Sequence, residues 1–260
     1  MNIRFPYSGW LFDLDGTVYR GEELIPGAQE VIRALRESGR RVVFLSNKPI
    51  QTREEYAKKL TRLGIPTEPG HVVNSSLVLA RYLARHDPGA SCFVIGELPL
   101  IAELRAHGLH VREAPDVGWV VIAFDRTFTY AKLNTALQAV RRGARLIATN
   151  PDRTCPTESG EIPDCAGMMA AVEAVTGAEV EVVAGKPSPL ILEAALEVLA
   201  LPAVACVIVG DRIETDIAMG RALGVGTILV LSGVTRPEDS RVGELPQDHV
   251  LRSVREILEP

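Results

Sequence analysis

The chain has 260 residues, of which 47% are hydrophobic and 23% are charged, and its formal net charge at pH 7 is −5. A chain of this length can bury a core large enough to fold without disulfides or structural metals. The acidic balance without a basic cluster argues against a nucleic-acid polymer as partner. The sequence contains no signal-peptide pattern and no apolar run of the roughly 18 residues that a membrane span needs, so we expect a cytoplasmic protein without a membrane partner.

The first 87 residues alternate between apolar runs typical of strands and apolar-periodic segments typical of helices. The run "WLF" ends in two aspartates, and "RRVVFLSN" is a short, β-branched run that predicts a buried strand. The predicted elements are a strand at 10–12, a helix opened by 26–27 and closed by 39, a strand at 42–45, a helix at 52–63, a strand at 71–74 and a helix at 77–85.

A linker-like break, "HDPGAS" at 86–91, precedes a second alternating series. This series predicts strands at 92–95, 120–124 and 145–148 and helices at 98–106 and 130–141. The segment 149–164 has no periodicity and predicts a long functional loop. Beyond it we expect a helix at 168–175, a strand at 182–183, a helix at 190–199, a strand at 206–209, a helix at 216–223, a strand at 227–231 and an exposed tail with a short helix.

Strand–helix alternation predicts an α/β fold with a parallel sheet, in which ligands bind at the carboxyl ends of the strands. Polar residues follow four predicted strands at this point: Asp13 and Asp15, Ser46 and Asn47, Lys186, and Asp211 with Asp216 five residues later. Each has a simpler interpretation when taken alone. Ser46 could cap a strand end, Lys186 could be a solvated charge, and Asp211 could cap the next helix.

The combination of these residues favours phosphoryl transfer. Asp13 and Asp15 project to the same side of a strand, where two carboxylates repel each other unless a cation binds between them. Carboxylate oxygens are the ligands that Mg²⁺ prefers. We therefore expect Asp13 as nucleophile, Asp15 as general acid and base, and Ser46 and Lys186 as donors to the transferred phosphoryl group.

The motifs "DLDGT", the serine of "FLSN", the lysine of "GKPSP" and "GDRIETD" resemble, in order, the four motifs of the haloacid dehalogenase superfamily. The resemblance implies a Rossmann-like three-layer core and an aspartyl-phosphate intermediate on Asp13. It also implies phosphate binding by Ser46, Asn47 and Lys186. Mg²⁺ would be bound by Asp13, Asp211 and the Asp15 backbone carbonyl, with Asp216 binding or orienting the metal shell.

The spacing of these motifs indicates a subclass. Only 33 positions separate Asp13 from Ser46, whereas 140 separate Ser46 from Lys186, so we expect a cap domain inserted in the longer interval. This arrangement resembles the NagD-like, or IIA, phosphatases. We predict a hydrolase core at 1–87 and 184–260 and a cap at 88–183. Members often dimerise through the cap, which makes a homodimer possible here.

The predicted cap loop offers candidate specificity residues. Asn150, Asp152 and Cys155 could contact substrate or could simply shape turns; Asp125 and Arg126 leave the same two possibilities open. The segment "IPDCAGMM" has Asp and Ala where many NagD-like members have Gly, and it is more similar to bacterial sugar-phosphate phosphatases. Cys155 and Cys165 lie in no CxxC motif, and we expect free thiols.

We therefore predict a Mg²⁺-dependent phosphomonoester hydrolase whose partner is a small phosphorylated metabolite. Sugar phosphates are the first choice, followed by nucleoside monophosphates and pyridoxal phosphate. The alternative is a phosphometabolite sensor with the same fold and little turnover. A signalling receiver domain would lack the Asp-x-Asp pair, a phosphomutase of this family would carry its cap between the first two motifs, and a dinucleotide-binding enzyme would need G-x-G-x-x-G after a strand.

Overall fold

A computed structural model describes residues 3–157, 160–244 and 249–258, and the chain divides into two compact units. The first unit comprises Met1–Ser46, Arg53–Val73 and Ile191–Pro260, and the second comprises Asn47–Thr52 and Asn74–Leu190. The predicted insertion, 88–183, falls within the second unit, which also includes 74–87 and 184–190. That these units act as hydrolase core and cap stays a prediction.

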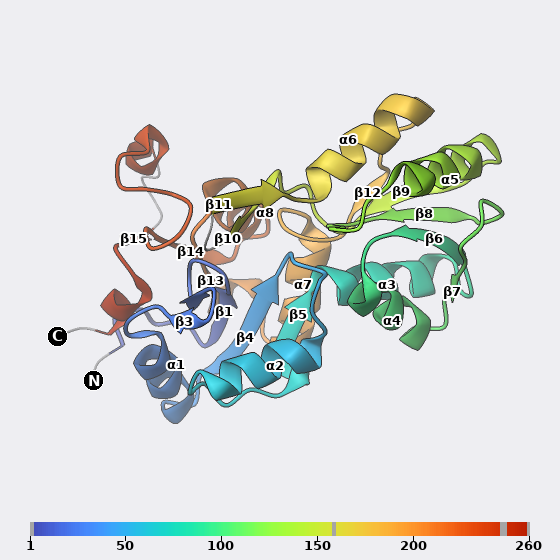
Figure 1. Ribbon diagram of the computed structural model, residues 1–260. Helices are drawn as coiled ribbons and strands as arrows, with labels where there is room; N and C mark the ends of the chain where they lie inside the picture. Colours follow the sequence, from blue (N-terminus) through green and yellow to red (C-terminus); the bar gives the residue numbers. More distant parts are fainter. Residues whose placement is uncertain (1–2, 158–159, 245–248, 259–260) are drawn as a thin grey trace. The chain divides into compact units, whose positions relative to one another are not determined.

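The first unit is built on a six-stranded sheet with the order β15-β14-β13-β1-β4-β5 (Figure 1). The pairs that join β4, β1, β13, β14 and β15 are all parallel, as the strand–helix alternation predicts. The strands are β1 (Gly9–Asp13), β4 (Arg41–Ser46), β5 (Val72–Asn74), β13 (Cys206–Gly210), β14 (Gly226–Val230) and β15 (His249–Leu251).

Helices cover both faces of this sheet because successive strand residues point in opposite directions. On one face, α1 (Ala28–Glu37), α2 (Arg53–Arg62) and the short helix η5 (Val254–Ile257) contribute to one large apolar core. That core includes Trp10 and Phe12 of β1. On the other face, the π-helical turn η3 (Ile213–Ile217) packs Ile217 against Leu229 of β14 and leads into α8 (Ala218–Ala222). The predicted three-layer α/β class is confirmed.

The second unit has its own parallel sheet, with the order β12-β9-β8-β6-β7. In Figure 1, α5 (Tyr130–Arg141) and α6 (Cys165–Thr176) lie on one face, and α3 (Ser75–His86) and α4 (Leu98–Ala106) lie on the other. The strands are β6 (Ser91–Ile95), β7 (His110–Val111), β8 (Trp119–Ile122), β9 (Arg145–Ala148) and β12 (Val182–Val183).

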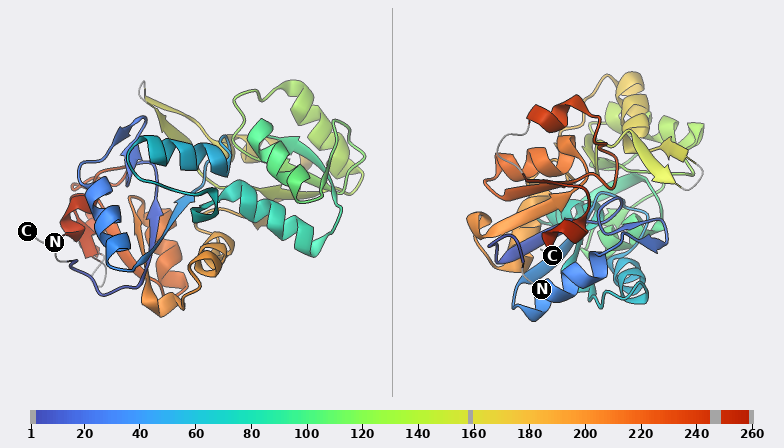
Figure 2. Two further views of the ribbon diagram at one scale, coloured as in Figure 1. Left: turned by 90° about the horizontal axis from the view of Figure 1, so that it is seen from below. Right: turned by 90° about the vertical axis from the view of Figure 1, so that its left-hand side faces the viewer.

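Two expectations about irregular segments are wrong. The predicted loop at 149–164 contains the antiparallel hairpin β10 (Thr154–Thr157) and β11 (Gly160–Pro163), and prolines within both strands had weakened any strand signal there. The C-terminal segment is no exposed tail. It adds β15 to the sheet, and Val254 and Ile257 of η5 are buried. Ile3 pairs with Leu258, so the first and last described residues lie side by side (Figure 2).

The remaining helices and hairpins are short. The expected helix at 216–223 is a π-helical turn followed by α8, and helix α7 (Pro189–Leu199) begins one residue before its expected start. A two-stranded hairpin, β2 (Tyr19–Arg20) and β3 (Glu23–Leu24), follows β1 and was absent from the predicted elements because strands of two residues have no periodicity. Among the described residues, no helix is long and apolar enough to cross a membrane.

Candidate active site

Three neighbouring strands bring polar side chains to the carboxyl edge of the first sheet. β1 lies between β13 and β4, and its last residue, Asp13, is in register with Leu45, one residue before Ser46. Asp211 follows directly after Gly210, the last residue of β13. Parallel strands end at a common edge, so Asp13, Ser46 and Asp211 converge there as predicted. All three are buried.

The turn after Asp13 brings the backbone at Gly16 close to the Asp211 carboxylate. The Leu14 carbonyl accepts hydrogen bonds from the backbone amides of Val18 (2.9 Å) and Tyr19 (3.2 Å), which closes one tight helical turn. Gly16 has a φ of 92°, a conformation that favours glycine. A Cβ atom at Gly16 would lie 2.5 Å from Asp211 Oδ2, so only glycine lets this turn approach that carboxylate.

Asp211 and Asp216 are both held by backbone amides. Asp211 Oδ2 accepts a 2.6 Å hydrogen bond from the amide of Val234. Asp216 is fully buried in the π-helical turn, where its Oδ2 accepts hydrogen bonds of 3.3 Å from the Arg212 amide and the Thr215 hydroxyl. Asp216 thereby fixes the loop that begins with Asp211, and its role in binding or orienting a metal stays a prediction.

The donors at this edge fit a hard divalent cation. Asp13 and Asp211 are 7% and 1% exposed, they end adjacent strands, and all the donors are oxygens, the ligand type that Mg²⁺ takes. Among the described residues, no group of three or more His, Cys, Asp or Glu side chains could hold a metal alone. Two carboxylates together with the Asp15 backbone carbonyl make a set that includes only two such side chains, so the predicted ligands remain compatible with this finding.

Two tyrosines that the sequence analysis did not single out as functional also lie at this edge. Ser46 Oγ donates a 3.0 Å hydrogen bond to the hydroxyl of Tyr56 on α2. Tyr19, at the start of β2, is 1% exposed, and its pKa is raised well above its ordinary value by burial and then by the nearby charge of Asp15. The charge of Asp13 contributes in the same direction. Tyr56 lies on the apolar periodic face of its helix, and Tyr19 lies in a strand too short to have a periodicity, so the sequence did not distinguish either from a core residue.

In the second unit, Asn47 and Lys186 are linked through backbone and amide groups. Asn47 Oδ1 accepts a 2.8 Å hydrogen bond from the Lys186 amide, and Asn47 Nδ2 donates to the Lys186 carbonyl at 3.1 Å. The same Nδ2 donates to Asp152 at 2.9 Å. The Asn47 side chain therefore fixes the backbone at Lys186, whose own side chain is 4% exposed.

The predicted specificity residues belong partly to this network. Asn150 is buried and donates to Asp152 (2.9 Å) and to Asp164 (3.2 Å), which caps α6 by accepting from the Cys165 amide. Burial raises the pKa of Asp164. Cys155 lies in the β10–β11 hairpin, 5% exposed, and all four cysteines are free and buried.

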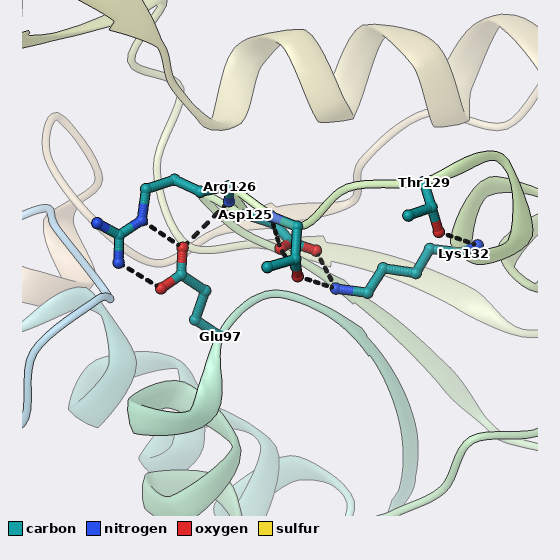
Figure 3. A network of polar contacts seen from close by, with 6 residues as sticks. Glu97, Asp125, Arg126, Thr129 and Lys132 are labelled. Carbon is teal, nitrogen blue, oxygen red and sulfur yellow. Dashed lines mark hydrogen bonds and ion pairs between the residues drawn. The ribbon is translucent and has the colours of Figure 1, made fainter.

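Asp125 and Arg126 form a separate polar cluster that Figure 3 shows in close-up. Asp125 accepts from Lys132 Nζ at 2.5 Å and from the Thr127 hydroxyl at 2.7 Å, and its side chain is fully buried. Arg126 forms a bidentate ion pair with Glu97, in which Nε donates to Oε1 at 2.8 Å and Nη2 donates to Oε2 at 2.7 Å. These pairs join the end of β8 to the first turns of α5 and α4, so both residues have architectural partners.

Comparison with known proteins agrees with this geometry. A family model described as haloacid dehalogenase-like hydrolase matches residues 10–110, and a second, HAD-hydrolase-like, model matches residues 183–257. The sugar-phosphatase AraL of Bacillus subtilis is 44% identical over 96% of this chain and 92% of its own length. An acid sugar phosphatase of Staphylococcus saprophyticus is 36% identical over 97% of both chains.

A solved structure also matches nearly the whole chain. The p-nitrophenyl phosphatase from Archaeoglobus fulgidus superposes with a TM-score of 0.90 at 35% identity, over 96% of this chain and 98% of its own. The match extends over both compact units and includes every predicted motif. The chain therefore belongs to the haloacid dehalogenase-like hydrolase family and is a phosphatase of its NagD-like class.

Proposed function

We propose that this phosphatase hydrolyses small phosphomonoesters with the help of Mg²⁺, through a phosphoryl group carried on Asp13. The observation that carries the proposal is the convergence of Asp13, Asp15 and Asp211 at adjacent strand ends of the first sheet. The tight turn that follows Asp15 brings Gly16 close to the Asp211 carboxylate, which supports the proposal.

Each side chain of the candidate site has its own role in the proposed reaction. An Asp13 carboxylate oxygen attacks phosphorus, and the bond from phosphorus to the ester oxygen breaks as that oxygen takes a proton from Asp15. Asp15 then removes a proton from the water that cleaves the acyl phosphate and regenerates Asp13. Ser46 donates to a phosphoryl oxygen, and Lys186 is expected to supply positive charge to the same group. Mg²⁺ bound by Asp13, Asp211 and the Asp15 carbonyl would offset the repulsion between carboxylate and phosphate.

Sugar phosphates are the first substrate class that we propose. Two relatives that align with nearly the whole chain are named sugar phosphatases. Nucleoside monophosphates and pyridoxal phosphate are the next candidates. Asn150, Asp152 and Cys155 stay predicted specificity residues. A cytoplasmic location, to which the four free thiols are suited, and dimerisation through the second unit stay predictions as well.

The decisive experiment measures phosphate release from a panel of sugar phosphates, nucleoside monophosphates, pyridoxal phosphate and 4-nitrophenyl phosphate, with Mg²⁺ or with EDTA. We compare wild type with Asp13→Asn, which keeps the side-chain shape but cannot form the acyl phosphate. Asp116→Asn is the matched control, because Asp116 is exposed in the second unit. We expect turnover only with Mg²⁺ and with Asp13 intact.

Other outcomes point elsewhere. Turnover by Asp13→Asn, or in EDTA, would show that the proposed mechanism is wrong. A wild type that binds sugar phosphates but releases no phosphate would favour the sensor. Turnover restricted to nucleoside monophosphates or pyridoxal phosphate would keep the mechanism and overturn the substrate class.

A further inference from the structure

The side chain of Tyr19 holds a buried hydroxyl with no hydrogen-bond partner in the described part of the chain. Tyr19 is 1% exposed, so bulk water does not serve as its partner. A buried hydroxyl without a partner destabilises a fold, whereas a phenylalanine ring in the same place would carry no such cost. The question is what this hydroxyl is there to bind.

The backbone places Tyr19 directly beside Asp15. The Gly16 amide donates a 2.8 Å hydrogen bond to the Tyr19 carbonyl, and Asp15 and Tyr19 form an isolated parallel bridge. The tight turn after β1 therefore brings the first residue of β2 back to the proposed acid and base. No flexible segment separates the two residues, so their relative position is fixed by the turn itself.

Helix α2 holds the Tyr19 ring in place. Lys59 Nζ lies 3.8 Å from the centroid of the ring. The Lys59 side chain is only 11% exposed, and it also pairs with Glu22 at 3.4 Å. A cation over an aromatic face is attracted to it, which limits movement of the ring. Tyr56 lies one helical turn before Lys59 on the same face of α2 and contacts Ser46.

The surroundings of the Tyr19 hydroxyl also favour its protonated form. Burial, and then the negative charges of Asp15 and Asp13 together with the Tyr56 hydroxyl, raise the pKa of Tyr19 well above its ordinary value. A protonated tyrosine hydroxyl offers a hydrogen-bond donor rather than a negative charge. A neutral donor close to Asp15 and Asp13 suits an incoming oxygen anion.

We propose that the Tyr19 hydroxyl is a substrate-binding group of this enzyme, donating a hydrogen bond to an oxygen of the phosphoester bound beside Asp15. The inference rests on the proposed function, because it takes the edge that bears Asp13, Asp15 and Ser46 as the phosphoester site. It adds a donor from β2 to the predicted donors Ser46 and Lys186. The ring is held in the free enzyme, and the hydroxyl gains its partner when the phosphoester binds.

The test compares wild type with Tyr19→Phe, which keeps the ring and removes only the hydroxyl. Tyr7→Phe is the control, because Tyr7 lies near Gly226 at the opposite, amino edge of the same sheet. Three quantities are measured in Mg²⁺: the Tm of the free protein, the increase in Tm caused by inorganic phosphate, and kcat and KM for the best sugar phosphate.

We expect the free Tyr19→Phe protein to melt at or above the wild-type Tm, because it loses an unpartnered buried donor. We expect a smaller phosphate-induced shift and a kcat/KM lower by roughly tenfold or more, the usual effect of losing a hydrogen bond to a charged group. Tyr7→Phe should match wild type in the phosphate-induced shift and in kcat/KM.

Two results would overturn the proposal. An unchanged phosphate shift and unchanged kcat/KM in Tyr19→Phe would show that the hydroxyl does not contact the phosphoester. A lower Tm of the free variant with normal kinetics would show that a buried water is its partner. Asp13→Asn, assayed in parallel, separates this failure from failure of the proposed function. If Asp13→Asn stays active the mechanism is wrong, and phosphate binding by Tyr19→Phe then decides the role of Tyr19 alone.

Discussion

The Ser46 hydroxyl donates a hydrogen bond to the Tyr56 hydroxyl across 3.0 Å, in a buried contact between the end of β4 and the first turn of α2. A serine hydroxyl has one proton, so in this arrangement that proton is directed at Tyr56. To bind a phosphoryl oxygen, Ser46 has to turn its proton away and accept one from Tyr56. The two hydroxyls can exchange roles without moving either residue.

This reversal predicts a positioning role for Tyr56. In Tyr56→Phe the ring still packs in the core, but Ser46 loses the donor that polarises it. We expect the variant to lose about 1 kcal/mol of transition-state stabilisation, which lowers kcat/KM roughly fivefold. Most of the effect falls on kcat if the contact matters in the transition state. Steady-state kinetics with Mg²⁺ and a sugar phosphate provide the measurement.

A double-mutant cycle separates positioning from simple packing. If Tyr56 acts through Ser46, then Tyr56→Phe has no further effect on kcat/KM once Ser46 is alanine. Additive losses in the Ser46→Ala, Tyr56→Phe double variant would contradict the prediction. The Tm values of the four proteins show whether any loss arises from unfolding instead.

Asn47 gives a second prediction, because its side chain satisfies backbone groups of Lys186 and also binds Asp152. Asn47→Ala leaves the buried amide of Lys186 without this acceptor, and a lost partner of this kind costs about 1–3 kcal/mol. We expect a lower Tm and weaker binding of inorganic phosphate, measured by thermal unfolding with and without phosphate. Asn134→Ala, at an exposed position of α5, is the control. A normal phosphate affinity in Asn47→Ala would contradict the predicted phosphate-binding role of the Asn47–Lys186 pair.

The sequence was sufficient to predict where the carboxylates of the candidate site lie, because strand ends and residue order determine their positions. Asp13, Ser46 and Asp211 converge simply because β13, β1 and β4 are adjacent and parallel. The contribution of Tyr19 and Tyr56 could not be predicted. Whether a buried tyrosine hydroxyl has a partner depends on three-dimensional contacts between β2, α2 and β4, and an apolar periodicity does not contain that information.

The dependence on three-dimensional contacts also explains why the predictions for residues 149–164 and for the C-terminal segment were wrong. The antiparallel pair β10–β11 places Cys155 opposite Ile162, but its prolines and short strands remove the alternation by which strands are recognised. β15 is three residues long and gains its stability from pairing with β14. In both places tertiary pairing, and not local propensity, determines the structure.

The ion pair between Glu97 and Arg126 predicts a dependence of stability on pH. Hydrogen bonds from Arg126 lower the pKa of Glu97 below its ordinary 4.5. A carboxyl group with a lowered folded-state pKa stabilises the fold above its unfolded pKa, and that stabilisation is lost as the pH falls through the folded value. Because the Arg126 side chain is 55% exposed, we expect only about 0.5–1 kcal/mol.

Glu97→Gln should therefore be less stable than wild type at pH 7, and the difference should shrink as the pH falls below 4.5. Urea unfolding of both proteins between pH 3 and pH 7, at constant ionic strength, provides the measurement. Glu113→Gln, at an exposed position of the same unit, controls for the loss of one negative charge. A Glu97→Gln difference that is constant with pH would show that packing, and not charge, makes the contribution.

Gly233 provides a prediction about the metal site, because it lies against the proposed metal ligand Asp211. A Cβ atom at Gly233 would overlap the Asp211 carboxylate, although the backbone conformation there does not itself require glycine. In Gly233→Ala the carboxylate has to move, and the 2.6 Å hydrogen bond from the Val234 amide to Asp211 Oδ2 is strained or lost. Groups that orient a metal ligand commonly change metal affinity by roughly 10- to 100-fold.

We expect Gly233→Ala to need at least roughly tenfold more Mg²⁺ for half-maximal activity, and to recover part of its kcat at saturating Mg²⁺. The measurement is a Mg²⁺ titration of phosphate release at a fixed sugar-phosphate concentration. Gly243→Ala is the matched control, since it adds the same methyl group in the same unit where no atom lies within 4 Å. If Gly233→Ala and Gly243→Ala require the same Mg²⁺ concentration as wild type, Asp211 does not bind the metal that supports catalysis.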